Sequence, residues 1–221
     1  MKNIYEKTRL YIKENPRVLL FLYLPVYLLW YFLIERRAMP EYYVSYMPLD
    51  DQIPFVPPFI LAYMLWFPYL VLTALYLYLR DARAFVRFGL FFIVSITICM
   101  LVCTVFPNGQ NLRPADTGGG LFGWLIDRIY AADTNTNVLP SMHVVGCFAV
   151  CFAAFDARGL RRLRIPILVL GIAICAATVL IKQHSFLDVI WSAVVAVVVG
   201  AGVYLAPLLT RGTKGRGRAS Y

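Results

Sequence analysis

The chain has 221 residues, of which 61% are hydrophobic and only 15% are charged. Soluble domains average about 45–50% apolar and about 25% charged residues, so this composition excludes the soluble class as well as disordered, collagen-like and disulfide-scaffold proteins. The net charge of +9 is accounted for by basic residues near helix ends that face anionic lipid, and we therefore expect no nucleic-acid partner.

Charged residues divide the chain into six long uncharged runs. Each run reaches the roughly 17–25 residues that a membrane-spanning helix needs. Backbone groups inside lipid must be hydrogen-bonded within the segment, which favours helices. The sequence therefore predicts an all-α, polytopic membrane protein, with one membrane domain over 1–221. Its six transmembrane helices are expected at about 18–36, 56–80, 85–106, 141–157, 165–182 and 186–207.

The basic residues predict the orientation of these helices. Of the 21 Lys and Arg residues, 16 lie in the N-terminal segment, the loops after the second and fourth spans, and the tail. The positive-inside rule places these segments in the cytoplasm, so both termini and the basic tail 211–221 are expected there. The segment 107–140 is then an extracytoplasmic loop with an interfacial helix. The segment between Arg37 and Pro58 is interpreted as an interfacial aromatic belt.

The chain has only two histidines, and both lie at predicted extracytoplasmic ends of spans. Ionisable groups at membrane depth are costly and usually functional. His184 and Asp188 are four residues apart, which places them on one face of a helix. A carboxylate bonded to one ring nitrogen leaves the other free as base or nucleophile. An ordinary helix-capping interaction explains this pair equally well.

Two further segments carry candidate groups. His143 follows Pro140, Ser141 and Met142 where the fourth span begins; Pro and Ser are favoured at helix starts, and a helix start offers free N–H groups to an anion. Arg113 follows the third span, and its planar guanidinium suits phosphate oxygens. An interfacial arginine that binds lipid headgroups is the alternative for Arg113.

Taken in order, these segments resemble the type 2 phosphatidic acid phosphatase superfamily, whose motifs read K-x6-R-P, P-S-G-H and S-R-x5-H-x3-D. The resemblance covers about Phe106 to Asp188. The matching residues are Arg113, Pro114, Pro140, Ser141, His143, His184 and Asp188. The chain departs from the motifs at the first Lys, which is Phe106, at the Gly, which is Met142, and at Ser-Arg, which is Ala177-Thr178.

The resemblance implies a phosphatase that acts on a lipid phosphate or diphosphate taken from the bilayer, with no cofactor and no metal. It also implies an integral protein of a bacterial plasma membrane with an extracytoplasmic site. His184 would be the nucleophile that forms a phosphohistidine, oriented by Asp188, and His143 would be the general acid and base. The substrate would contact Arg113, Ser141, Pro140 and Met142, with Lys182 as a candidate replacement for one missing cation.

Three alternatives remain open. In the first alternative, the chain is a phosphotransferase that moves a headgroup between lipids, as in sphingomyelin and inositol-phosphorylceramide synthases. The loss of cations favours it, because a phosphomonoester carries about −1.5 to −2 charge and a phosphodiester carries less. Alternatively, His143, His184 and Asp188 form a two-His-one-carboxylate metal site. The third alternative is a non-enzymatic transporter or scaffold.

Overall fold

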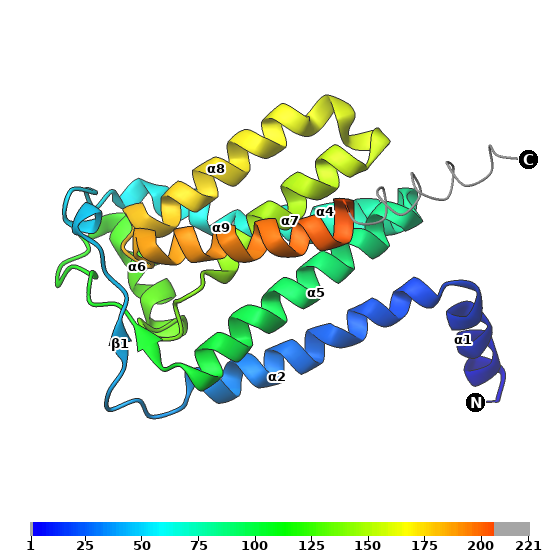
Figure 1. The fold of residues 1–221 in the computed structure, drawn as a ribbon, viewed down its shortest axis with the longest axis horizontal. Helices are drawn as coiled ribbons and strands as arrows, with labels where there is room; N and C mark the ends of the chain where they lie inside the picture. The colour runs from blue at the N-terminus through cyan, green and yellow to red at the C-terminus, as the bar shows by residue number, and fades with distance from the viewer. Residues whose placement is uncertain (1, 206–221) are drawn as a thin grey trace, which may run out of the picture.

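A computed structural model describes residues 2–205, which form a helical bundle with a single pair of very short strands (Figure 1). The α-helices are α1 (Lys2–Glu14), α2 (Tyr23–Glu35), α3 (Ile60–Met64), α4 (Trp66–Arg80), α5 (Ala82–Val105), α6 (Gly120–Ala132), α7 (Met142–Asp156), α8 (Arg164–Leu180) and α9 (Phe186–Gly200). The strands are β1 (Tyr43–Val44) and β2 (Asn108–Gly109). Short 3-10 or π segments are η1 (Pro16–Leu22), η2 (Pro48–Asp51), η3 (Pro57–Phe59), η4 (Arg158–Leu163) and η5 (Ala201–Leu205).

Five helical stretches are long and apolar enough to cross a membrane. They are Pro16–Glu35, Pro57–Arg80, Ala82–Val105, Arg158–Leu180 and Phe186–Leu205, and each coincides with one of the expected spans. The remaining span was expected at 141–157 and corresponds to α7, which has 15 residues. At 1.5 Å per residue α7 is about 22 Å long, shorter than a hydrocarbon core of roughly 30 Å. The all-α class is confirmed, while six crossings stay a prediction. The tail 211–221 lies outside the described residues.

Helix α7 is the centre of the bundle and packs against α4, α5, α8 and α9. Its buried residues are mostly small, which lets neighbouring helices approach closely. Gly146 is one of them: a Cβ atom there would lie 2.6 Å from the indole nitrogen of Trp66. Any side chain at this position would push Trp66 away from α7. The sequence therefore places a large aromatic ring of α4 directly on the first turns of α7.

The stretch that contains α2 is the least buried of the five candidate membrane spans. It packs on α5, and Ile34 is its only buried residue in the described structure. Large apolar side chains such as Leu24, Leu29 and Leu33 are more than half exposed. Lipid chains are the environment in which such a surface is stable. In Figure 1, α1 and η5 lie at the same end of the bundle, opposite the end that carries β1 and α6. We call this second end the loop end.

Three segments that are far apart in sequence are joined at the loop end. Strands β1 and β2 pair in parallel, with Tyr43 opposite Asn108, and Gly109 also bridges Thr136. A Cβ atom on Gly109 would lie 2.7 Å from the Tyr42 ring, so glycine is required for this close approach. This pairing draws part of the 37–58 segment inward and buries Ser45 and Asp50, which the aromatic-belt interpretation did not predict.

Candidate active site

His184 immediately precedes Ser185, the N-terminal cap of α9. Its Nδ1 atom lies 3.1 Å from Oδ2 of Asp188, and both side chains are buried. The contact expected from their spacing is therefore confirmed. Because Nδ1 is bonded to the carboxylate, Nε2 is the ring nitrogen left for a ligand in the cavity that His184 lines.

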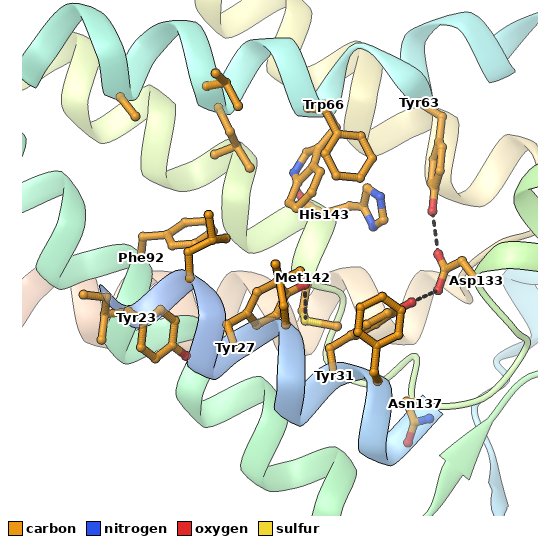
Figure 2. Close-up of a pocket in the computed structure, with 18 of the residues that line it drawn as sticks. Tyr23, Tyr27, Tyr31, Tyr63, Trp66, Phe92, Asp133, Asn137, Met142 and His143 are labelled. Atoms are coloured by element: carbon orange, nitrogen blue, oxygen red, sulfur yellow. Dashed lines mark hydrogen bonds between the residues drawn. The ribbon is translucent and has the colours of Figure 1, made fainter. Parts of the chain in front are cut away.

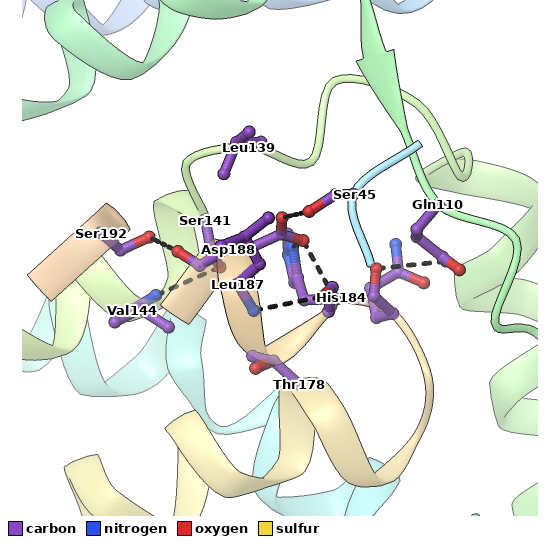
Figure 3. Close-up of polar contacts among 12 residues, drawn as sticks. Ser45, Gln110, Leu139, Ser141, Val144, Thr178, His184, Leu187, Asp188 and Ser192 are labelled. Carbon is purple, nitrogen blue, oxygen red and sulfur yellow. Dashed lines mark hydrogen bonds and ion pairs between the residues drawn. The ribbon is translucent and has the colours of Figure 1, made fainter. Parts of the chain in front are cut away.

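The Asp188 carboxylate has two further hydrogen-bond donors (Figure 3). The hydroxyl of Ser45 donates to Oδ1, and the backbone N–H of Ser185 donates to Oδ2 at 3.1 Å. Ser45 lies 143 residues before Asp188 in the chain. A buried carboxylate must be hydrogen-bonded to remain stable. Ser45 therefore helps to fix the group that orients His184, and no sequence pattern marks it.

Asp50 fixes the start of α9 from the same loop. Its Oδ2 atom accepts a hydrogen bond of 2.6 Å from the hydroxyl of Ser185, and its Oδ1 atom accepts one of 2.8 Å from the backbone N–H of Phe186. A negative charge at a helix N-terminus is favourable, since the helix dipole is positive there. The loop that carries Ser45 and Asp50 thus holds both the helix start and the carboxylate of the candidate pair.

His143 lies in the first turn of α7 and is held by aromatic packing (Figure 2). Its ring centroid is 4.3 Å from that of Tyr63 and 4.5 Å from that of Trp66. The Trp66 indole N–H donates to the His143 carbonyl at 2.9 Å. The centroids of the two histidine rings are 5.9 Å apart. Both predicted histidines are therefore brought to one place, His143 from the first turn of α7 and His184 from the turn before α9.

A cavity of about 570 Å³ begins at the two histidines. Along most of its length it is lined by apolar and aromatic residues of η1, α2, α4 and α5, from His143 and His184 to Leu20 and Phe85. Along α2 alone the lining runs from Tyr23 to Phe32, about 14 Å at 1.5 Å per residue. An apolar cavity with a few polar groups at one end is the usual form of a small-molecule site.

Asp133 is the functional candidate that sequence reasoning missed. It lines the cavity together with both histidines. Its carboxylate accepts hydrogen bonds from the hydroxyls of Tyr31 at 3.1 Å and Tyr63 at 3.0 Å, and from the Gln183 amide at 2.9 Å. The only available signal was an acidic residue beside a predicted extracytoplasmic span, which nothing distinguished from the other acidic residues of that side.

Arg113 is not in the cavity lining but contacts residues that are. Its guanidinium donates to the carbonyls of Tyr130 and Asp133 and, at 2.8 Å, to the side-chain oxygen of Gln183. It also lies 4.1 Å from the centre of the Tyr130 ring. Burial lowers the pKa of Arg113 from its ordinary value. Gln183 therefore connects the predicted arginine to Asp133, and Arg113 itself is not part of the cavity lining.

Lys182 does not reach the cavity. Its ammonium donates to the backbone carbonyls of Asp50 and Ile53 at 2.8 and 2.6 Å. Lys182 has a φ of 55°, a left-handed conformation that is uncommon for a residue other than glycine. The chain turns sharply here, so that Gln183 and His184 line the cavity while Lys182 is bonded to the loop. The Lys182 ammonium is therefore held by the loop and lies outside the cavity lining, where the missing phosphate-binding cation was expected.

The remaining predicted residues surround the start of α7. Ser141 is its N-terminal cap and accepts a hydrogen bond from the backbone N–H of Val144. Ser141 and the preceding Pro140 are buried. Met142 lines the cavity, and its sulfur accepts a hydrogen bond from the hydroxyl of Tyr27 at 3.8 Å. Of these three residues, only Met142 is in the cavity lining.

The positions that depart from the family motifs have structural roles. Phe106 is exposed and packs on Tyr43, with ring centroids 5.4 Å apart. Thr178 is buried, and its hydroxyl donates to the Cys175 carbonyl. Its own carbonyl accepts from the backbone N–H of His184. Neither position offers a charge to a phosphate.

The metal site considered for His143, His184 and Asp188 is not assembled. Within residues 2–205, no group of three or more His, Cys, Asp or Glu residues is placed to hold a metal ion.

Comparison with known families agrees with the motif analysis. Residues 107–210 match the family model of the PAP2 superfamily, the superfamily of type 2 phosphatidic acid phosphatases. The matched region contains Arg113 and both histidines, and the proteins of that superfamily are enzymes that act on phosphoesters. No curated protein and no solved structure matches the chain. This match supports a phosphatase or phosphotransferase type of function and leaves the substrate open.

Proposed function

We propose that the protein is a membrane enzyme that cleaves a phosphoester of a lipid through a phosphohistidine on His184. The observation that carries this proposal is the buried pair of His184 and Asp188 at the polar end of an apolar cavity. A covalent intermediate divides one difficult step into two easier ones. An apolar cavity beside the histidines suits the hydrocarbon chain of a lipid.

In the first step, the lone pair of His184 Nε2 forms a bond to phosphorus, and the bond from phosphorus to the lipid alcohol oxygen breaks. His143 gives a proton to that oxygen, and the alcohol leaves. In the second step, His143 takes a proton from water, whose oxygen attacks phosphorus as the P–N bond breaks. If an acceptor alcohol takes the place of water, the same two steps make the enzyme a phosphotransferase, which is the second candidate function.

Phosphoryl transfer depends mainly on positioning and on stabilisation of oxygen charge. The first turn of α7 provides donors for this purpose: within residues 2–205, the backbone N–H groups of Met142 and His143 have no hydrogen-bond partner in the chain. Unpaired N–H groups at a helix N-terminus are an anion site. They would hold the equatorial oxygens between the two imidazole rings, with Arg113 supporting the site through Gln183.

The proposal includes a topology in which the chain crosses the membrane six times and both termini are cytoplasmic. The loop end, with α6 at the interface, would then face the extracytoplasmic side. Placement of α1 and η5 at the opposite end of the bundle supports this arrangement (Figure 1).

The test is to trap the intermediate. Purified protein in detergent is mixed in parallel with phosphatidic acid and with phosphatidylethanolamine, each carrying a radiolabelled phosphate, and is quenched in alkali, in which phosphohistidine survives. Stability in alkali and loss in acid are typical of phosphohistidine, and the chain has only two histidines, so the variants decide whether the label depends on His184. We expect it in the wild type and not in His184→Ala. Turnover by His184→Ala at the wild-type rate would contradict the proposal.

A further inference from the structure

The polar end of the cavity combines a carboxylate with tyrosines. Figure 2 shows Asp133 between Tyr31 and Tyr63, on the side of the cavity toward which the His143 ring points. Asp133 is half-buried, and both of its carboxylate oxygens accept hydrogen bonds from tyrosine hydroxyls. Because Tyr63 stacks on His143 and also binds Asp133, the carboxylate is one tyrosine side chain away from the proposed site of phosphoryl transfer.

The charges that line the cavity have the wrong sign for a lone phosphate. Among the described residues of the lining, Asp133 is the only Asp or Glu, and no Lys or Arg is present. A phosphomonoester would bring about −1.5 to −2 charge close to this carboxylate. In a cavity lined mostly by apolar side chains, such repulsion is stronger than in solution. Phosphatidic acid is therefore a poor electrostatic match for the site.

A substrate with a positive group beside its phosphate would reverse this repulsion. A carboxylate pairs with an ammonium, and tyrosine faces attract cations within about 6 Å. The lining holds both kinds of group near the histidines: Asp133, and the rings of Tyr27 and Tyr31 from α2. A zwitterionic phosphodiester would place its phosphate between the histidines and its ammonium against Asp133, leaving its alkyl chains for the apolar part of the cavity.

We propose that Asp133 determines substrate specificity and that the lipid is a phosphodiester whose headgroup carries an ammonium. This inference rests on the proposed function, since it assumes that His184 attacks phosphorus. In the step concerned, His184 Nε2 bonds to phosphorus and the diacylglycerol oxygen leaves with a proton from His143. The phospho-headgroup then remains on His184, from which water or an acceptor alcohol removes it.

The experiment compares three lipids with identical acyl chains: phosphatidic acid, phosphatidylglycerol and phosphatidylethanolamine. Their headgroups are a bare phosphate, a hydroxyl-bearing diester and an ammonium-bearing diester. Diacylglycerol release gives kcat/KM for each lipid, and trapping of labelled His184 shows whether the intermediate forms. We expect phosphatidylethanolamine to exceed each of the other two at least tenfold in the wild type.

Substitutions at Asp133 should change this preference in a charge-dependent way. Asp133→Asn is expected to lower kcat/KM for phosphatidylethanolamine at least tenfold and to raise it severalfold for phosphatidic acid. Asp133→Glu retains the charge and should retain the preference. The matched control is Asp127→Asn, an exposed carboxylate of α6 that bonds Thr117 and lies outside the cavity. It should leave all three values unchanged.

The outcomes separate this inference from the proposed function. Preference for phosphatidic acid by the wild type, with label on His184, overturns the inference and keeps the proposed function. Equal use of phosphatidylglycerol and phosphatidylethanolamine also overturns it, because Asp133 would then recognise a hydroxyl. If no lipid labels His184 or releases diacylglycerol, both fail. Should Asp133→Asn not fold, the wild-type ratio and Asp133→Glu still decide the question.

Discussion

The two histidines face the same cavity but are held in different ways. His184 is fixed by hydrogen bonds: its Nδ1 atom is bonded to Asp188, which in turn binds Ser45 and Ser185. His143 is fixed by packing, with its ring against Tyr63 and Trp66. Within the described part of the chain, no residue is hydrogen-bonded to a ring nitrogen of His143.

The difference indicates a division of labour. A nucleophile needs one tautomer and one direction of attack, and a carboxylate on the opposite ring nitrogen provides both. A group that gives and takes a proton in successive steps needs two accessible protonation states, and packing positions the ring without favouring one tautomer. Hydrogen bonding therefore suits His184 as the nucleophile, and aromatic packing suits His143 as the acid and base.

The largest effect should come from disrupting the hydrogen bond between Asp188 and His184. Asp188→Asn replaces the carboxylate by a neutral amide, whose NH2 group can face Nδ1 and favour the wrong tautomer of His184, and a comparable change in a Ser-His-Asp triad costs about 10⁴ in kcat. We expect a loss of about this size, with most of the phosphohistidine label gone in rapid-quench experiments. The matched control is Asp51→Asn, an exposed carboxylate of the same loop that binds Tyr46. A loss below tenfold would show that Asp188 only caps α9.

The second-largest effect should come from removing the ring of His143, which is held by aromatic packing. His143→Ala is expected to lower kcat by about 10²–10⁴ for a lipid alcohol, the usual contribution of general acid–base catalysis. Formation of the phosphohistidine should recover with a nitrophenyl phosphoester, whose leaving group needs no proton. Burst kinetics with the two substrates measure this difference. Equal losses with both substrates would mean that His143 binds the phosphate and transfers no proton.

A smaller effect is expected at Arg113, which supports the site indirectly. Arg113→Lys keeps the charge, but an ammonium cannot replace a planar fork that bonds Tyr130, Asp133 and Gln183. We expect kcat/KM to fall about 10- to 100-fold and thermal stability to drop, measured by lipid turnover and by thermal unfolding in detergent. Arg128→Lys is the matched control, since Arg128 is an exposed arginine of α6. Wild-type activity in Arg113→Lys would exclude a role for these three guanidinium contacts.

Much of the helical architecture was predictable because hydropathy acts locally. A run of apolar residues is stable in lipid only as a helix, and five such runs have the expected length. The contact between His184 and Asp188 was predictable for a related reason, since helix geometry alone brings residues four apart together. The family motifs added His143, whose position at the start of α7 follows from the cap residue Ser141.

The residues that were missed depend on contacts across the fold. Ser45 and Asp133 reach the site from irregular segments, where no periodicity relates a side chain to its neighbours. Their partners Asp188 and Tyr31 lie 143 and 102 residues away in sequence. Lys182 shows the converse: only one residue separates it from His184, but a left-handed backbone turn at Lys182 leaves the two side chains with different partners. Proximity in sequence was therefore a poor guide to the position of the Lys182 side chain, because the backbone conformation determines where that side chain points.

The smallest effect is expected at Ser45, which supports the hydrogen bonds that hold His184. Ser45→Ala removes one of the donors to the Asp188 carboxylate but leaves its contacts with His184 and Ser185. Hydrogen bonds to charged groups contribute about 1.5–3 kcal/mol, and the remaining donors compensate in part, so we expect kcat to fall about tenfold.

Because Ser45 lies outside the cavity lining, KM should stay constant while kcat falls. Ser95→Ala is the matched control, since Ser95 is a buried serine of α5 whose hydroxyl has no hydrogen-bond partner among residues 2–205. It should retain wild-type kinetics. A change in KM for Ser45→Ala, or equal losses in both variants, would mean that the loop of Ser45 shapes the fold without orienting the nucleophile.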